Sequence, residues 1–147
     1  MSGELVSGSI LCLAAEFAVA SELCRRNIYT QLTLGKQKRT DLLLMSSNGG
    51  FSRVEVKAKQ GREWPNCRGI YGALAFLVFV DYAGRGNTDR PDFFVLTEKD
   101  WLRVLNKKSR QFNRENLISE SSWTMRTSPY SLMRSISMGN RIREWVF

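Results

Sequence analysis

The chain has 147 residues and contains no histidine. This absence excludes a Ser-His-Asp triad, a Cys-His pair, a His-ligated zinc ion and an imidazole general base. The cysteines are few and odd in number, and Cys12, Cys24 and Cys67 match no zinc-binding spacing. Any chemistry must therefore use carboxylates, lysines, hydroxyls or thiols.

Long hydrophobic runs are also missing. The most apolar early stretch, residues 10–24, is interrupted by Glu16 and Glu22, and no basic leader precedes it. We therefore expect a cytoplasmic protein that contacts no membrane and keeps its cysteines reduced. Cys12 and Cys24 lie in the apolar stretch, where a thiol is expected to be buried as a small hydrophobic side chain.

Positive charge dominates the chain and is concentrated toward its C-terminus. The sequence holds 22 Lys plus Arg against 14 Asp plus Glu, which is a net charge of +8. Residues 1–100 carry +2 of this excess and residues 101–147 carry +6. Such a surface favours a polyanionic partner, and nucleic acid is the commonest polyanion inside cells. The alternative is a basic surface that only keeps the protein in solution.

Helical spacing of apolar residues predicts a helix over residues 9–26. Six of its side chains are expected to face the core: Ile10, Leu13, Ala14, Phe17, Ala20 and Cys24. Ser7 or Ser9 is expected to cap the start of this helix, and Asn27 is expected to end it.

Strand patterns follow the first helix. They cover residues 28–34, 41–45, 51–59, 73–82 and 91–96, and the turn-forming residues 46–50 join the second and third patterns into a hairpin. A capping box at Thr97-Glu98-Lys99-Asp100 opens a second helix. This order predicts a single α/β domain over residues 1–147 with a mixed central β-sheet flanked by helices. Its core spans about residues 8–107, and a basic extension spans about residues 108–147.

Charged residues on two predicted strands point to a metal site. Glu55 and Lys57 are two residues apart, so both lie on one face of the sheet. A hairpin centred near residue 48 places Asp41 nearly opposite Glu55 on the paired strand. Opposed carboxylates repel each other, and a hard divalent cation relieves that repulsion, with oxygen ligands favouring Mg²⁺ or Mn²⁺. Glu16, an acid with apolar neighbours on the first helix, is a third acidic candidate.

An acid on the first helix, Asp41 at the start of a strand and Glu55-Val56-Lys57 on the next strand resemble the PD-(D/E)XK nuclease superfamily. The resemblance implies a restriction-endonuclease-like core, covers roughly residues 8–107, and looks most like the small Holliday-junction resolvases. It implies that Asp41, Glu55 and the Val56 carbonyl bind the metal, that Lys57 is catalytic and that Glu16 completes the site. The residue before Asp41 is a threonine, where the family motif has proline.

Basic residues on either side of this constellation are expected to contact phosphates without reading sequence: Lys36, Lys38, Arg39, Lys59 and Arg62. The sequence thus predicts a Mg²⁺- or Mn²⁺-dependent endonuclease that hydrolyses DNA with structure selectivity or weak sequence specificity, in recombination, repair or defence. A homodimer is one way to act on two strands. The alternatives are a non-catalytic nucleic-acid-binding module of the same fold and an effector or toxin nuclease.

Overall fold

The computed structural model describes residues 5–33, 40–64, 69, 70, 72 and 74–112. Seven elements follow one another in the chain: α1 (Gly8–Cys24), β1 (Tyr29–Leu32), β2 (Leu42–Met45), β3 (Phe51–Lys59), β4 (Ala75–Asp81), β5 (Asp92–Leu96) and α2 (Glu98–Phe112). The expected phosphate contacts Lys36, Lys38 and Arg39 lie outside the described residues. Residues 113–147 of the basic extension also lie outside them. In the described part of the chain, no helix combines the length and apolar character needed to cross a bilayer.

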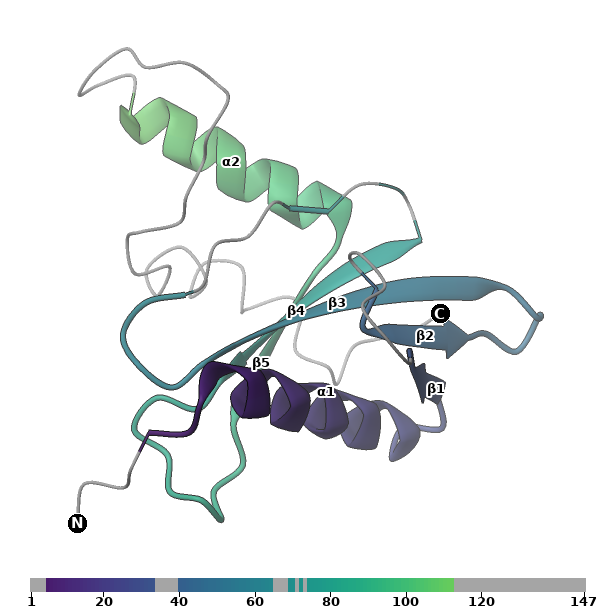
Figure 1. Cartoon of the computed structure of the whole chain (residues 1–147). Coiled ribbons are helices and arrows are strands. Elements are labelled where there is room, and N and C mark those ends of the chain that lie inside the picture. The colour runs from purple at the N-terminus through teal and green to yellow at the C-terminus, as the bar shows by residue number, and fades with distance from the viewer. Residues whose placement is uncertain (1–4, 34–39, 65–68, 71, 73, 113–147) are drawn as a thin grey trace.

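The five strands form one mixed sheet in the order β1-β2-β3-β4-β5. Neighbouring strands are antiparallel except β3 and β4, which run parallel. Parallel neighbours need a connection that returns the chain to the same end of the sheet, and residues 60–74 separate β3 from β4 in the sequence. The α/β fold with a mixed sheet is therefore confirmed (Figure 1).

The β2–β3 hairpin has the turn that its sequence predicts. Gly49 has a φ of 80°, a conformation that glycine adopts without steric cost. The Ser46 N–H donates to the Gly50 carbonyl at 2.9 Å, and the Asn48 side chain accepts the Gly50 N–H at 3.0 Å. This turn sets the register of the hairpin, which determines the residues that face each other beside the candidate site.

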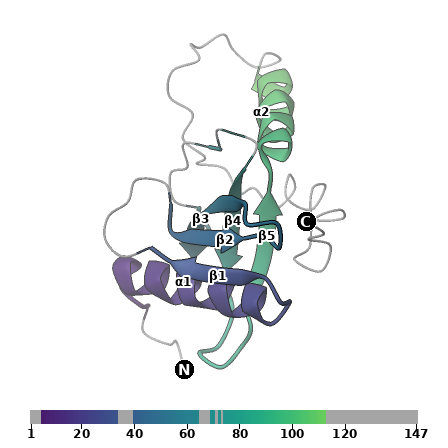
Figure 2. The same ribbon diagram turned by 90° about the vertical axis from the view of Figure 1, so that its right-hand side faces the viewer.

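The sheet separates two apolar clusters, one under each helix. The α1 side holds residues from α1 and from β2 to β5, among them Leu11, Val19, Leu23, Leu42, Leu44, Val54, Val56, Val78 and Val80. The α2 side holds Trp64, Ile70, Ala75, Leu77, Phe79, Leu96, Trp101 and Val104. Both views show α1 and α2 on opposite sides of the sheet (Figures 1 and 2). β4 contributes to both clusters, as expected of a central strand.

The face of α1 that meets the sheet agrees with the predicted one only at Ala20 among the six expected core residues. The buried residues of α1 are Leu11, Ala15, Val19, Ala20, Glu22 and Leu23. Ile10, Leu13 and Phe17, which were expected in the core, are instead 60%, 49% and 56% exposed. Cys12 and Cys24 are exposed as well, so the expectation of buried thiols is wrong for both. Because α1 is apolar on nearly every side, periodicity alone did not identify the side that packs.

Local capping residues end α1 and begin α2. Asn27 has a φ of 62°, and the Ile28 N–H donates to the Leu23 carbonyl at 3.1 Å, which closes α1 as predicted. The Thr97 N–H donates to the Asp100 carboxylate at 3.0 Å and the Asp100 N–H donates to Thr97 Oγ1 at 3.3 Å, which confirms the capping box. At the start of α1, however, the side chain of Ser7 makes no capping hydrogen bond.

Candidate active site

The candidate site lies where β2 stops accompanying β3. The ladder between these strands ends at the Leu42–Val54 pair, whereas β3 continues to Lys59. Just before β2, the Asp41 N–H donates to the Val54 carbonyl at 2.9 Å. Asp41 and Leu42 therefore both lie against Val54 at the point where the ladder ends, and the chain bends at Asp41. The orientation of Asp41 is thus set by this bend rather than by simple strand alternation.

The Asp41 carboxylate occupies the edge of β3 beyond the end of β2. Its Oδ2 accepts the Val56 N–H at 2.6 Å. The N–H and C=O groups of one strand residue point to the same side of the strand. The Val56 carbonyl consequently lies on the same edge of β3 as the Asp41 carboxylate. This edge therefore carries both a backbone carbonyl oxygen and carboxylate oxygens.

Glu55 and Lys57 lie on one face of β3 and form an ion pair. Lys57 Nζ is 2.6 Å from Glu55 Oε1, and the two side chains are 25% and 15% exposed respectively. Both groups are thus largely withdrawn from water while remaining accessible at the surface. An ammonium held this close to a carboxylate stays in a defined position.

The pKa values of the neighbouring acids show that four side chains share one electrostatic environment. Burial raises the pKa of Asp41, the Val56 N–H and Lys57 lower it, and Glu55 raises it. Burial also raises the pKa of Glu16 above its ordinary value of 4.5, Asp41 raises it further, and Lys57 lowers it. Three carboxylates therefore lie near Lys57, and the pKa values of Asp41 and Glu16 both lie above their ordinary values.

The donor set suits a hard divalent cation. Carboxylate and carbonyl oxygens are the ligands that Mg²⁺ and Mn²⁺ prefer, and a cation would stabilise the ionised form of these partly buried carboxylates. Within the described residues, no three acidic or cysteine side chains are arranged as a complete metal cage. Mg²⁺ commonly uses only one or two carboxylates and keeps several waters. The residues therefore fit a two-carboxylate site at Asp41 and Glu55, with Glu16 nearby.

Lys59 does not lie where a phosphate contact would require. Its side chain is 2% exposed, and its Nζ lies 3.1 Å from Asp81 Oδ2. The same ammonium lies 4.9 Å from the centre of the Trp64 ring. The expected contact of Lys59 with DNA is therefore wrong, because the charge is buried in an ion pair between β3 and β4. Arg62 is exposed just after β3, and its phosphate contact stays a prediction.

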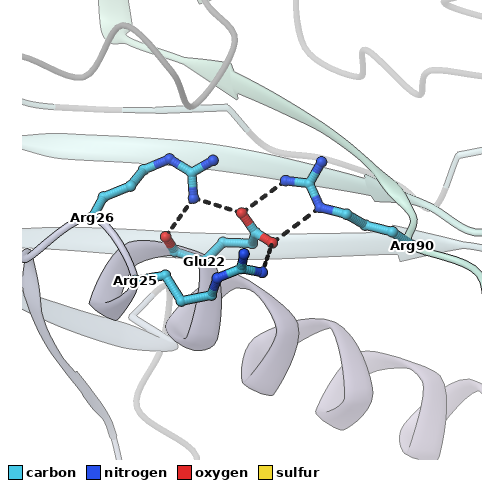
Figure 3. Close-up of polar contacts among 4 residues, drawn as sticks. All are labelled: Glu22, Arg25, Arg26 and Arg90. Atoms are coloured by element: carbon cyan, nitrogen blue, oxygen red, sulfur yellow. Dashed lines mark hydrogen bonds and ion pairs between the residues drawn. The ribbon is translucent and has the colours of Figure 1, made fainter.

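Sequence reasoning missed a second charged cluster, around Glu22 of α1 (Figure 3). The Glu22 carboxylate is 8% exposed, and Arg25 lies 3.6 Å from it. Arg90 donates to it at 3.0 Å and 2.7 Å, and Arg26 donates at 2.5 Å. These hydrogen bonds, first that of Arg90 and then that of Arg26, lower the pKa of Glu22 to about 2 although burial opposes them. The helical spacing of Arg25 and Arg26 was visible in the sequence, whereas the contact with Arg90 was not.

The fold of the chain has a weak similarity to a protein of known structure. No protein-family model matches the chain, and no curated protein matches it. Among solved structures, the chain is similar to the bacterial homing endonuclease I-Ssp6803I, with 12% sequence identity and a TM-score of 0.49. The match covers 92% of this chain and 99% of that chain. At this level of similarity no residue role is transferred, and the candidate site rests on the geometry of the chain itself.

Proposed function

We propose that the protein is a metal-dependent endonuclease that hydrolyses DNA phosphodiester bonds, and that it is a PD-(D/E)XK nuclease with a restriction-endonuclease-like core. The observation that carries the proposal is the Glu55–Lys57 ion pair beside Asp41 at the break in the β2–β3 ladder, with Glu16 close enough for the charges of Asp41 and Lys57 to shift its pKa. Perturbed carboxylates beside a lysine are typical of sites that bind a cation together with a phosphate group.

Each residue of the proposed site has a distinct task. A bound Mg²⁺ or Mn²⁺ would polarise the scissile phosphate and lower the pKa of a bound water. Asp41, Glu55 and the Val56 carbonyl would hold the ion, and the 2.6 Å bond from the Val56 N–H fixes the orientation of Asp41. Lys57, 2.6 Å from Glu55, can donate to the attacking water or to a phosphate oxygen and stabilise the negative charge of the transition state.

DNA would be held by contacts to its backbone. Arg62 is exposed just beyond β3, and the basic residues Lys36, Lys38 and Arg39 immediately precede Thr40 and Asp41 in the chain. Contacts of this kind supply affinity without reading sequence, so cleavage is expected to be structure-selective or weakly specific. Association of two copies and a cytoplasmic location also stay predictions; sedimentation velocity tests the first and imaging of a tagged protein the second.

Nicking of a supercoiled plasmid with Mg²⁺, Mn²⁺ or EDTA tests the proposal. We expect wild type to cut only with a metal ion, and Asp41→Asn, Glu55→Gln and Lys57→Ala to lose at least about 100-fold in rate. Glu63→Gln and Lys99→Ala are matched controls, since both residues are exposed outside the site and should cut like wild type.

A different result would favour one of the alternatives. If wild type cuts no supercoiled, branched or single-stranded DNA, and Lys57→Ala binds DNA as wild type does, the protein is a non-catalytic binding module. An effector or toxin nuclease shares the chemistry of the site. If expression of wild type arrests cell growth and expression of Lys57→Ala does not, the protein is an effector or toxin nuclease.

A further inference from the structure

Three large apolar side chains form an exposed row across β1, β2 and β3. The strand register aligns Tyr29 with Met45 and Met45 with Phe51. Side chains aligned in this way share one face of the sheet, with Cβ atoms about 5 Å apart. Tyr29 is 60% exposed, Met45 41% and Phe51 61%. We refer to these three residues as the apolar row.

The apolar row lies on the sheet face that points away from α1. Leu44 and Ser52, the strand neighbours of Met45 and Phe51, are buried at 2% and 8% exposure, and Leu44 belongs to the cluster under α1. Strand alternation therefore directs Met45 and Phe51 to the opposite face. On that face the α2 cluster gathers over β4 and β5, and α2 lies at the end of the sheet remote from the β2–β3 turn (Figure 1). Within the described part of the chain, the row is consequently open to a ligand.

The apolar row continues along β3 into the candidate active site. Phe51, Arg53, Glu55 and Lys57 alternate onto one face of β3, the first two exposed and the last two partly buried. At about 3.3 Å per residue, Phe51 lies about 13 Å from Glu55. One nucleotide of a stacked strand advances about 3.4 Å, so this distance spans about four nucleotides. A DNA strand with a phosphate at the site can therefore reach the row within a few nucleotides.

We infer that the apolar row stacks against unpaired bases of the DNA strand whose phosphodiester lies at the candidate site; the inference rests on the proposed function. Aromatic side chains next to a positive charge bind single strands because every base offers a flat face and every phosphate a negative charge. Arg53, exposed between the row and Glu55, supplies that charge. Paired bases inside a duplex have both faces covered, so the row selects flaps, bubbles or junctions with unpaired nucleotides beside the cut.

Binding to labelled oligonucleotides in EDTA tests this inference without any cleavage. With a single-stranded oligothymidylate, Phe51→Ala is expected to weaken binding between about fivefold and a hundredfold, whereas Phe51→Trp retains it. Binding of a blunt duplex of equal length should be unchanged. Phe17→Ala is the matched control, because Phe17 is 56% exposed on α1 and should affect neither ligand. Tyr29→Ala is a second variant in case Phe51→Ala does not fold by circular dichroism.

Three outcomes would overturn the stacking role. The first is equal single-strand binding by Phe51→Ala and Phe17→Ala. The second is Phe51→Leu binding as tightly as Phe51→Trp, which would indicate apolar contact without stacking. The third is that Phe51→Ala changes the sedimenting mass of the protein but leaves its DNA binding unchanged, which would make the row a contact between protein copies. Absence of plasmid cleavage by wild type would refute the nuclease while leaving a single-strand binding result intact, so the two failures are distinguishable.

Discussion

Glu16 and Glu22 are the same residue type on the same helix, yet their surroundings shift their pKa values in opposite directions. The arginines around Glu22 lower its pKa to about 2. Burial and Asp41 raise the pKa of Glu16, and Lys57 offsets them only in part. Six residues correspond to about 9 Å along a helix and about 240° around it. The two carboxylates thus lie on different flanks of the buried stripe of α1.

The contrast separates a structural role from a binding role. At Glu22 the protein supplies its own positive charge, so an added cation would gain nothing there. Among the residues that the structure describes, the acids Glu16, Asp41 and Glu55 outnumber the lysine beside them, and an external cation can supply positive charge there. A protein that keeps poorly compensated, partly buried acids loses stability by doing so. The cluster with the raised pKa values is therefore the one that we propose to bind a cation.

The largest expected difference between the two acids is in cleavage. Glu16→Gln is expected to slow metal-dependent plasmid nicking about 10- to 100-fold, because it removes a charge beside the metal ligands. Glu22→Gln should stay within about twofold of wild type when assayed well below its unfolding temperature. Initial nicking rates of the two variants in parallel measure this. Equal losses in both variants would remove the distinction between the two clusters.

Stability is expected to show the reverse order. Glu22→Gln should lower the free energy of unfolding by on the order of 2 kcal/mol and the melting temperature by about 4–8 °C, since it breaks the ion pairs with Arg90 and Arg26. Because folding lowers the pKa of Glu22, this stabilisation is complete above pH 4.5 and is lost as the pH falls through about 2. Denaturant unfolding as a function of pH measures it. Glu16→Gln should be neutral or stabilising, and a comparable loss there would contradict the charge balance described for its site.

The smallest effect is the stabilisation by metal ions and its pH dependence. The pKa values of Asp41 and Glu16 are raised, so ionising them weakens the fold as the pH rises through these values. A divalent cation binds the ionised form, so Mn²⁺ at tenfold its dissociation constant should stabilise the protein by about 1.4 kcal/mol near neutral pH. The stabilisation should fade as the solution is acidified toward the ordinary carboxylate pKa. Thermal scans of wild type and Asp41→Asn measure it, and an equal shift in both proteins would place the ion elsewhere.

The parts of the fold that could be predicted from sequence are those with local causes. The Asn48-Gly49 turn set the β2–β3 register, Asn27 ended α1, and the Thr97–Asp100 box began α2. The turn, the helix end and the capping box each depend on residues a few positions apart, so a local sequence pattern is enough to predict them. The alternation of Glu55 and Lys57 on β3 follows from the period of a strand, and the ion pair between them agrees with it.

The features that could not be predicted depend on distant partners. Glu22 is buried because Arg90, 68 positions away, pairs with it. Lys59 alternates with Glu55 and Lys57 and was expected at the surface, but Asp81 and Trp64 enclose it. The packed side of α1 is chosen by the sheet, because an apolar helix presents no polar side to orient it. In each case tertiary contacts decide what the local pattern leaves open.

The buried pair of Lys59 and Asp81 also acts as a register marker for the centre of the sheet. β3 and β4 are parallel, and their apolar residues would pack almost as well if one strand slid by two positions. Such a slide would set Lys59 opposite Phe79 and leave two buried charges apart, whereas the observed register sets it opposite Asp81. The same alignment determines how far Glu55 and Lys57 stand from the end of the sheet. A buried charge pair outside the candidate site thereby sets the position of the side chains that we propose to act on the substrate.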